Sequence, residues 1–161
     1  MTLEKIIRDV IATEGNQQLT NDPADTGGKT IGGISEKWNP EAWKDGPPSP
    51  EKQREIYMQK YVLGPGFDKI ADKALQAQLV DFGVNSGPAV AIKKLQKVLA
   101  VTEDGVLGPQ TLAALKQTHP DDVNNCLVAE RVRMIGKIVS NNPTQLRFIN
   151  GWLDRAVQFL S

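Results

Sequence analysis

The sequence predicts a mostly α-helical protein with one small β-ribbon near its N-terminus. Apolar residues recur at helical spacing over residues 3–11, and again almost continuously from residue 68 onward. Between residues 15 and 35, however, Gly, Asp, Asn and Thr are too frequent for a helix. The chain of 161 residues is long enough for a real core. We expect an N-terminal lobe over 1–67 and a helical lobe over 68–161, packed as one compact unit.

The first helix is predicted from the apolar stripe formed by Leu3, Ile6, Ile7, Val10 and Ile11. The next position on that stripe holds Glu14, and Gly15 follows as a plausible helix terminator. Partial burial favours the protonated form of a carboxyl group, and a protonated glutamate can act as a general acid. A solvated glutamate in a fraying last turn is the alternative.

The ribbon that follows is predicted from two glycine pairs, Gly27-Gly28 and Gly32-Gly33, which favour tight turns. Trp38 and Trp43 come next, either as platforms on which sugars stack or as packing residues. A second helix is expected over 51–62, with Ser49 as its N-cap and Pro50 at its first position.

Five more helical segments are predicted after residue 68. The first ends near Gly83, and the others cover about 89–101, a start near Pro109, 121–139 and 144–160. We interpret Cys126 as a buried thiol. Tyr57, Tyr61 and Trp152 are interpreted as core residues rather than as sugar contacts.

The composition excludes several classes of function. Nineteen basic residues balance 19 acidic ones and no basic run occurs, so nucleic acid is not expected as a partner. One cysteine and one histidine do not supply a zinc site, and no metal or cofactor is expected. No segment approaches the length of a membrane span, so no membrane insertion is expected, and the N-terminus does not resemble a secretory signal. Carboxylates therefore remain as the groups for chemistry.

An acid at the end of a helix, followed by a ribbon with aspartates and a threonine, suits glycoside hydrolysis. That reaction needs one carboxylic acid to protonate the leaving oxygen and a second group to hold water or stabilise the transition state. Asp25 and Thr30 are candidates for the second role. Asp22 precedes Pro23 and is the other carboxylate candidate, or a turn residue.

These residues carry a resemblance to a known family. Glu14-Gly15, NDPAD at 21–25, Gly27-Gly28, Thr30 and Gly33-Ile34-Ser35 resemble the N-terminal motif of glycoside hydrolase family 108, although Asn16 replaces a glycine common there. DFGVNSGP at 81–88, the segment 95–115 and FINGWLDR near the end resemble the C-terminal part of that family, a predicted peptidoglycan-binding region. The resemblance covers nearly the whole chain.

The resemblance implies a lysozyme-like fold, with a small N-terminal β-ribbon followed by a helical bundle, and N-acetylmuramidase activity. The enzyme would cleave the β-1,4 bond between N-acetylmuramic acid and N-acetylglucosamine, with Glu14 as general acid. By analogy with phage-type lysozymes, Asp25 is the preferred second carboxylate, Asp22 the reserve, and Thr30 a third catalytic residue. A lytic transglycosylase and a non-catalytic wall-binding protein remain alternatives.

The expected partner is the peptidoglycan glycan strand, contacted by Asn85, Ser86, Trp38 and Trp43, and the protein is expected to be a monomer. The motif LQ…DG..G..T at 95–111 has either a packing role or a glycan-binding role. We expect synthesis in the cytoplasm and action in the periplasm or cell wall, after release through a holin-like or dedicated export route. Phage lysis and bacterial secretion are both possible settings.

Overall fold

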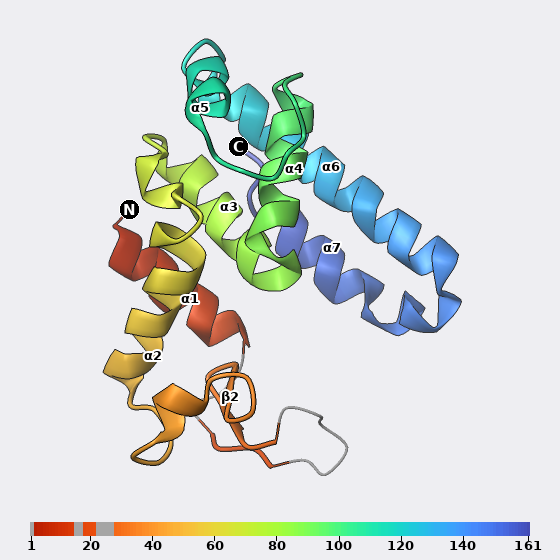
Figure 1. Ribbon diagram of the computed structural model, residues 1–161. Helices are drawn as coiled ribbons and strands as arrows, with labels where there is room; N and C mark the ends of the chain where they lie inside the picture. The colour runs from red at the N-terminus through yellow and green to blue at the C-terminus, as the bar shows by residue number, and fades with distance from the viewer. Residues whose placement is uncertain (1, 15–17, 22–27) are drawn as a thin grey trace. The chain divides into compact units, whose positions relative to one another are not determined.

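The computed structural model describes residues 2–14, 18–21 and 28–161, and the chain forms two compact units, Met1–Gly64 and Pro65–Ser161 (Figure 1). Helices dominate both units, and the strands in the described ranges form one antiparallel pair in the first unit. The predicted fold class, mostly α with a small N-terminal ribbon, is therefore confirmed. The expected division into lobes 1–67 and 68–161, packed together, stays a prediction.

The first unit is built on two helices that pack side by side, α1 (Leu3–Glu14) and α2 (Pro50–Met58). The apolar stripe of α1 is buried, as its spacing predicts. In the sequence between these helices, β1 (Thr30–Ile31) and β2 (Ile34–Ser35) form an antiparallel pair, with Ile31 opposite Ile34. The 3₁₀ helix η1 (Pro40–Trp43) leads toward α2, and the π-helical turn η2 (Gln59–Leu63) follows it.

The start of α2 is the one that the sequence predicts. The side chain of Ser49 accepts a hydrogen bond from the backbone N–H of Lys52 at 3.2 Å, and Pro50 occupies the first helical turn. An N-terminal cap satisfies a backbone donor that has no partner inside the helix, and proline sacrifices no helical hydrogen bond there. Asp72 caps the next α-helix in the same way, accepting from Leu75 N at 2.8 Å.

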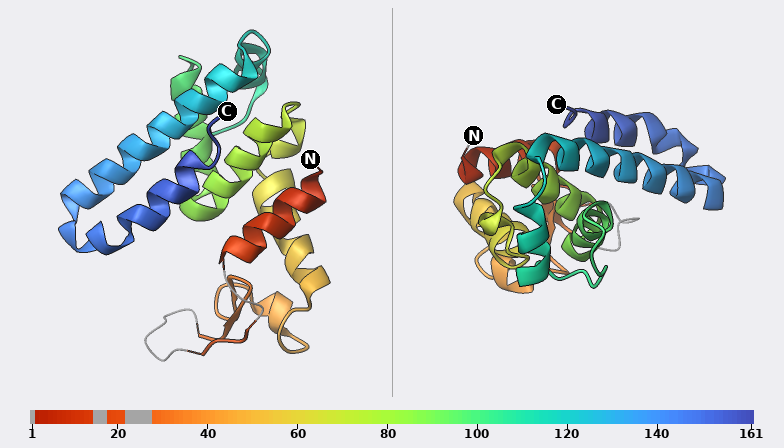
Figure 2. Two further views of the ribbon diagram at one scale, coloured as in Figure 1. Left: turned by 180° about the vertical axis from the view of Figure 1, so that it is seen from behind. Right: turned by 90° about the horizontal axis from the view of Figure 1, so that it is seen from above.

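All the secondary-structure elements of the second unit are helices. Its helices are α3 (Lys73–Ser86), α4 (Pro88–Val98), α5 (Pro109–Leu115), α6 (Pro120–Asn141) and α7 (Ile149–Val157), with 3₁₀ turns η3 (Phe67–Lys69) and η4 (Pro143–Phe148). α3 packs against both α4 and α6, and α6 and α7 run side by side (Figure 2). Residues 75–83 of α3 are all buried, so α3 is the core helix of this unit.

A buried cluster of charges joins three of these helices. Asp81 of α3 accepts hydrogen bonds from Arg131 Nη2 of α6 at 2.8 Å and from Arg155 Nε of α7 at 2.9 Å. The side chains of Asp81 and Arg131 are only 4% and 2% exposed. Burial lowers the pKa of the Arg131 guanidinium, and the Asp81 carboxylate opposes that effect. The Arg131 guanidinium also lies 4.7 Å from the Phe82 ring centroid.

Several predicted helix ends differ from the structure. α3 continues past Gly83 to Ser86, because Gly83 serves close packing: a Cβ there would lie 3.2 Å from the Phe67 ring. Termination falls instead at Gly87, whose φ of 91° favours glycine. α2 ends at Met58 and continues as the π-helical turn, and the segment expected as one helix over 144–160 divides into η4 and α7. Cys126 is exposed, so the prediction of a buried thiol was wrong: it lies on the solvent side of α6.

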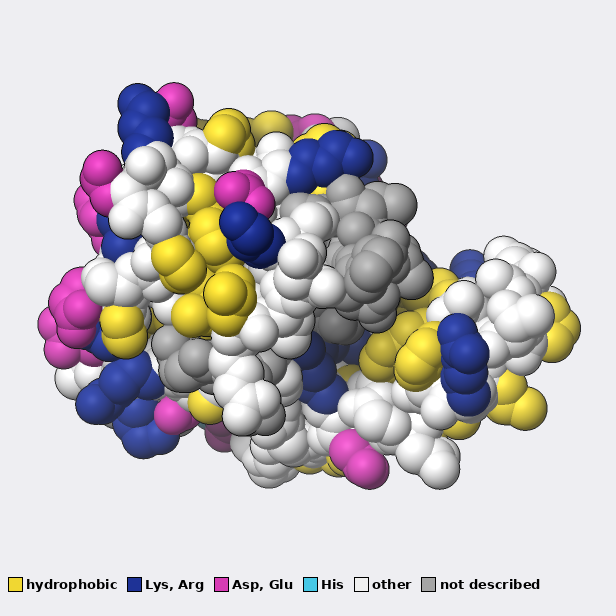
Figure 3. All heavy atoms as spheres, turned by 90° about the horizontal axis from the view of Figure 1, so that it is seen from below, with side chains coloured by type: hydrophobic (Ala, Val, Ile, Leu, Met, Phe, Trp, Pro, Cys, Tyr) yellow, Lys and Arg dark blue, Asp and Glu magenta, His cyan; other side chains and the backbone are white. Residues whose placement is uncertain are grey.

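The surface carries charges of both signs. On the face shown in Figure 3, acidic side chains lie among lysines and arginines, as the balanced composition predicts. In the described part of the chain, no helix has the length and apolar character needed to cross a membrane.

Replacing Asp81 with alanine should destabilise the protein by about 3–5 kcal/mol, because two guanidinium groups lose their buried counter-charge. Urea unfolding of wild type and Asp81→Ala would measure this loss. The control is Asp9→Ala, which removes the exposed ion pair of Asp9 with Lys5 (2.6 Å) and should cost at most about 1 kcal/mol. Similar losses in both variants would contradict a special role for the buried cluster.

Candidate active site

The end of α1 places Glu14 where the sequence predicts it, at the limit of a buried apolar face. Val10 and Ile11, one turn earlier, are 4% and 6% exposed, whereas Glu14 is half-buried and its Oε1 is buried. Glu14 is the last residue of the helix. A carboxyl group thus lies at the end of a helix with one oxygen shielded from bulk water, which suits a general acid.

The turn of the β-hairpin packs against this helix end. Gly32 and Gly33 join the two strands with φ values of 53° and 74°, the left-handed geometry of a type I′ turn. A Cβ on Gly33 would lie 3.4 Å from Glu14 Cβ and 2.5 Å from Tyr57 Oη. The absence of a side chain at Gly33 therefore allows the turn to approach both α1 and α2.

Tyr57 is a supporting residue that the sequence analysis assigned only to the core. It is 3% exposed, and its hydroxyl donates a hydrogen bond to the carbonyl oxygen of Gly32 at 3.0 Å. This bond ties the turn to α2 across 25 positions of sequence. No local pattern signals such a contact, although a tyrosine on a buried helix face usually places its hydroxyl on a partner.

Thr30 lies on β1, two residues before the glycine turn, and is half-buried. Its backbone N–H and carbonyl both pair with Thr20 at 2.9 Å, and its hydroxyl donates to the carbonyl oxygen of Gly28 at 3.3 Å. Thr30 is thus fixed on a ribbon whose turn contacts Glu14. The predicted carboxylates Asp22 and Asp25 lie outside the described residues.

The two tryptophans occupy contrasting positions. Trp38 is 67% exposed, and Lys37 Nζ lies 4.9 Å from its ring centroid, so the residue is open to solvent and to a ligand. Trp43 is only 8% exposed, at the end of η1. Burial favours the packing role for Trp43, and exposure keeps a sugar-stacking role open for Trp38.

Asn85 and Ser86 belong to the second unit. They form the last turn of α3, which continues past its expected end near Gly83, and Gly87 alone separates α3 from α4. Asn85 is exposed, and its Nδ2 lies 3.5 Å from the Ser86 hydroxyl. Both polar side chains are therefore held on a helix end whose preceding turns are buried.

The motif LQ…DG..G..T forms a hydrogen-bonded junction around Gln96, which is 1% exposed. Gln96 Nε2 donates to Asp104 Oδ1 at 2.6 Å and to Thr111 Oγ1 at 3.1 Å, while Gln96 Oε1 accepts from Gly105 N at 2.9 Å. The bond from Gln96 is the main reason why the pKa of Asp104 is lowered. These contacts favour the packing role of the motif, because its polar groups are used to fix the α4–α5 connection.

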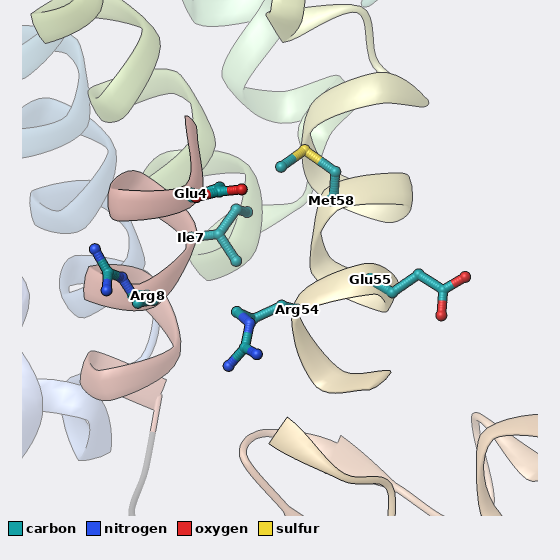
Figure 4. Close-up of a pocket in the computed structure, with 6 residues that line it drawn as sticks. All are labelled: Glu4, Ile7, Arg8, Arg54, Glu55 and Met58. Atoms are coloured by element: carbon teal, nitrogen blue, oxygen red, sulfur yellow. The ribbon is translucent and has the colours of Figure 1, made fainter. Parts of the chain in front are cut away.

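A separate groove of about 530 Å³ lies between α1 and α2 and is lined by Glu4, Ile7, Arg8, Arg54, Glu55 and Met58 (Figure 4). Its carboxylates do not face each other, because Glu55 points away from Glu4 and accepts a hydrogen bond from Lys52 Nζ at 2.8 Å. Glycoside hydrolysis needs two groups that flank one bond, so this groove does not match the predicted chemistry. Among the described residues, no group of three or more His, Cys, Asp and Glu side chains is arranged to hold a metal ion.

Comparisons with known proteins match the two halves of the chain to two families. The model described as Glycosyl hydrolase 108 matches residues 7–87, and the model described as Predicted Peptidoglycan domain matches residues 90–157. Among solved structures, SagA from Brucella abortus is 30% identical, with a TM-score of 0.75, over 96% of this chain and 89% of that one. A search of curated proteins gave no match.

Replacing Gly33 with alanine should lower the free energy of unfolding by about 2–3 kcal/mol. The alanine would have to adopt the positive φ of Gly33, and its Cβ would clash with the Tyr57 hydroxyl. The matched control is Gly28→Ala, which has a similar φ of 72° but no heavy atom within 4 Å, so it should show only the backbone cost of about 1–2 kcal/mol. Urea unfolding measures both variants. Equal losses would mean that the approach of the turn to Tyr57 contributes nothing.

Replacing Gln96 with alanine should cost about 1–3 kcal/mol, because it leaves buried donors and acceptors of the α4–α5 connection without partners. Gln110→Ala, at an exposed position of α5, should change stability by about 0.5 kcal/mol or less. Thermal or urea unfolding compares the two. If the Gln96 variant were as stable as the control, the hydrogen-bonded junction would not be a structural element.

Proposed function

Since this chain belongs to the glycosyl hydrolase 108 family and is a glycoside hydrolase that degrades peptidoglycan, we propose that it is an N-acetylmuramidase. In this proposal it hydrolyses the β-1,4 bond between N-acetylmuramic acid and N-acetylglucosamine. The observation that carries the proposal is the position of Glu14, at the end of α1, with a buried carboxyl oxygen and the glycine turn beside it.

Glu14 is the proposed general acid, which protonates the glycosidic oxygen as the bond to the sugar breaks. Without this proton the sugar would have to depart as an alkoxide, which is a poor leaving group, so proton donation lowers the activation barrier for cleavage of the glycosidic bond. The close approach of the glycine turn to Glu14 limits the orientations of the acid. A proton donor whose orientations are limited before the substrate arrives loses less freedom when the reaction begins.

The second group of the mechanism is assigned to the ribbon. Asp25 is the proposed second carboxylate, with Asp22 as its reserve, and Thr30 is proposed to help hold the attacking water. Support for Thr30 comes from its fixed place on β1, a strand whose turn meets Glu14. A hydroxyl that both donates and accepts hydrogen bonds can orient a water molecule.

Substrate contacts are proposed in both units. Trp38 offers an exposed ring for stacking on a sugar face, while Asn85 and Ser86 offer amide and hydroxyl groups for hydrogen bonds to the glycan. Trp43 contributes to the site through packing. The proposed place of action is the periplasm or cell wall, where peptidoglycan lies, reached through a holin-like pore or a dedicated export route. We propose that the protein acts as a monomer.

Mass spectrometry of fragments released from purified peptidoglycan tests the reaction and its acid together. Wild type should release fragments with reducing N-acetylmuramic acid ends, and Glu14→Gln should release them at least about a hundredfold more slowly, because it lacks the donated proton. Glu4→Gln, on the exposed face of the same helix, should retain the wild-type rate.

Two results would overturn this assignment. Fragments ending in 1,6-anhydromuramic acid would identify a lytic transglycosylase, in which no water attacks. A wild-type rate in Glu14→Gln would place the proton donor elsewhere. Circular dichroism of each variant would show whether its fold is intact.

A further inference from the structure

A second cavity, of about 330 Å³, lies in the helical unit between α4 and α6. Its lining residues are Lys94, Lys97, Glu130, Arg133, Met134, Gly136, Lys137, Ser140 and Asn141. All of them fall inside residues 90–157, which match the predicted peptidoglycan domain. The cavity is distinct from the Glu14 region and plays no part in the proposed chemistry.

The cavity is strongly basic. Four cationic side chains and a single carboxylate line it, which gives three net positive charges within a chain whose formal net charge is zero. The other acidic residues of the 90–157 region, which are Glu103, Asp104, Asp121, Asp122 and Asp154, are not part of the lining. Outside the lining, these five acidic residues are balanced by the five other Lys and Arg residues of the region, so its net positive charge lies at the cavity.

Glu130 organises these cations. Its side chain is only 7% exposed. Its carboxylate oxygens form ion pairs with Lys97 Nζ at 2.8 Å, Arg133 Nη1 at 2.9 Å and Lys94 Nζ at 3.5 Å. The hydrogen bond from Lys97, together with Arg133 and Lys94, holds the pKa of Glu130 below its ordinary value. One carboxylate neutralises only one of these charges, so the arrangement keeps an excess of cations directed at a small volume.

The helical spacing explains how the lining forms. Glu130, Arg133, Lys137 and Ser140 recur at intervals of three or four along α6 and so share one face, and Lys94 and Lys97 form the matching pair on α4. The side chain of Arg133 is 66% exposed, and its Nη1 donates to Glu130. Its remaining donors, with the Ser140 hydroxyl and the Asn141 amide, are suited to an anionic ligand that also carries amide groups.

We propose that this cavity binds a free carboxylate of the peptidoglycan peptide stem. The glycan strand itself is uncharged, because its amino groups are acetylated and the lactyl carboxyl of muramic acid is tied in an amide bond to the stem. The stem carries the free carboxylates, next to amide groups and alkyl carbons that Asn141 and Met134 can contact. The inference rests on peptidoglycan being the substrate, and it names the part of that polymer which the helical unit recognises.

Sedimentation of the full-length protein with purified peptidoglycan, on ice and at low salt, tests the cavity. Lys94→Gln/Lys137→Gln should bind about tenfold more weakly than wild type, because charge-assisted contacts to the carboxylate are lost. The matched control is Lys93→Gln/Lys116→Gln, which removes two exposed lysines of the same region, outside the cavity, and should bind like wild type. Lys94→Arg/Lys137→Arg should restore most of the binding, and circular dichroism of the glutamine variant should match that of wild type.

The ligand is tested by changing the polymer instead of the protein. Conversion of the peptidoglycan carboxyls to methylamides should weaken wild-type binding by about the same factor, and should weaken the Lys94/Lys137 glutamine variant no further. Undiminished wild-type binding to the methylamide polymer would overturn the proposal, as would equal losses in the cavity variant and its control. If removal of phosphate polymers with hydrofluoric acid abolished wild-type binding, the cavity would be a phosphate site and the carboxylate proposal would be wrong.

Reducing ends measured in the same wild-type samples, after warming, separate this inference from the proposed function. Carboxylate-dependent binding without new reducing ends would refute the muramidase and leave the cavity assignment in place. Release of N-acetylmuramic acid ends would support the muramidase. If binding in these samples were unchanged by the cavity substitutions and by the methylamides, the carboxylate assignment of the cavity would be refuted.

Discussion

The helical unit depends on the buried cluster of Asp81, Arg131 and Arg155, which joins α3, α6 and α7. A carboxylate removed from water is tolerated only when close, well-aligned partners replace its hydration, and here two guanidinium groups do so. The cluster also crosses a family boundary, because Asp81 belongs to the segment matched by the hydrolase model and both arginines belong to the peptidoglycan-domain segment. Within the second unit, α3, the last helix of the hydrolase-matched segment, is therefore held by helices of the segment matched to the peptidoglycan domain, and it ends in Asn85 and Ser86.

In the first unit the corresponding constraint is steric rather than electrostatic. The hairpin turn reaches Glu14 only because Gly33 has no side chain, and the hydroxyl of Tyr57 then fixes the Gly32 carbonyl. An acid at a helix end has freedom in its three χ angles, and each neighbour that occupies space around it removes some of that freedom. A glycine and a tyrosine can in this way influence the orientation of the carboxyl group that we propose as the general acid.

Features of local origin were predictable from the sequence. The stripe of α1, the Ser49 cap and the Gly32-Gly33 turn each follow from spacing or from the backbone preferences of single residues, and the structure confirms them. The contacts that position the site were not predictable, because Asp81 and Arg155 are 74 residues apart and Tyr57 and Gly32 are 25 apart. The same limit explains Gly83, since glycine as a helix terminator and glycine as a packing contact have the same local sequence, and only the nearby Phe67 ring distinguishes them.

In the segment matched to the peptidoglycan domain, the residues that stabilise the fold differ from those that we propose to bind the ligand. Gln96, Asp104 and Thr111, which make its motif recognisable, satisfy one another in the α4–α5 connection. A recognisable motif in such a domain can thus consist of residues that are needed for folding, while the residues that contact the ligand lie elsewhere. The basic cavity follows this logic: its cations lie on the adjacent faces of α4 and α6, where a substitution alters the charge without disturbing the Gln96 junction.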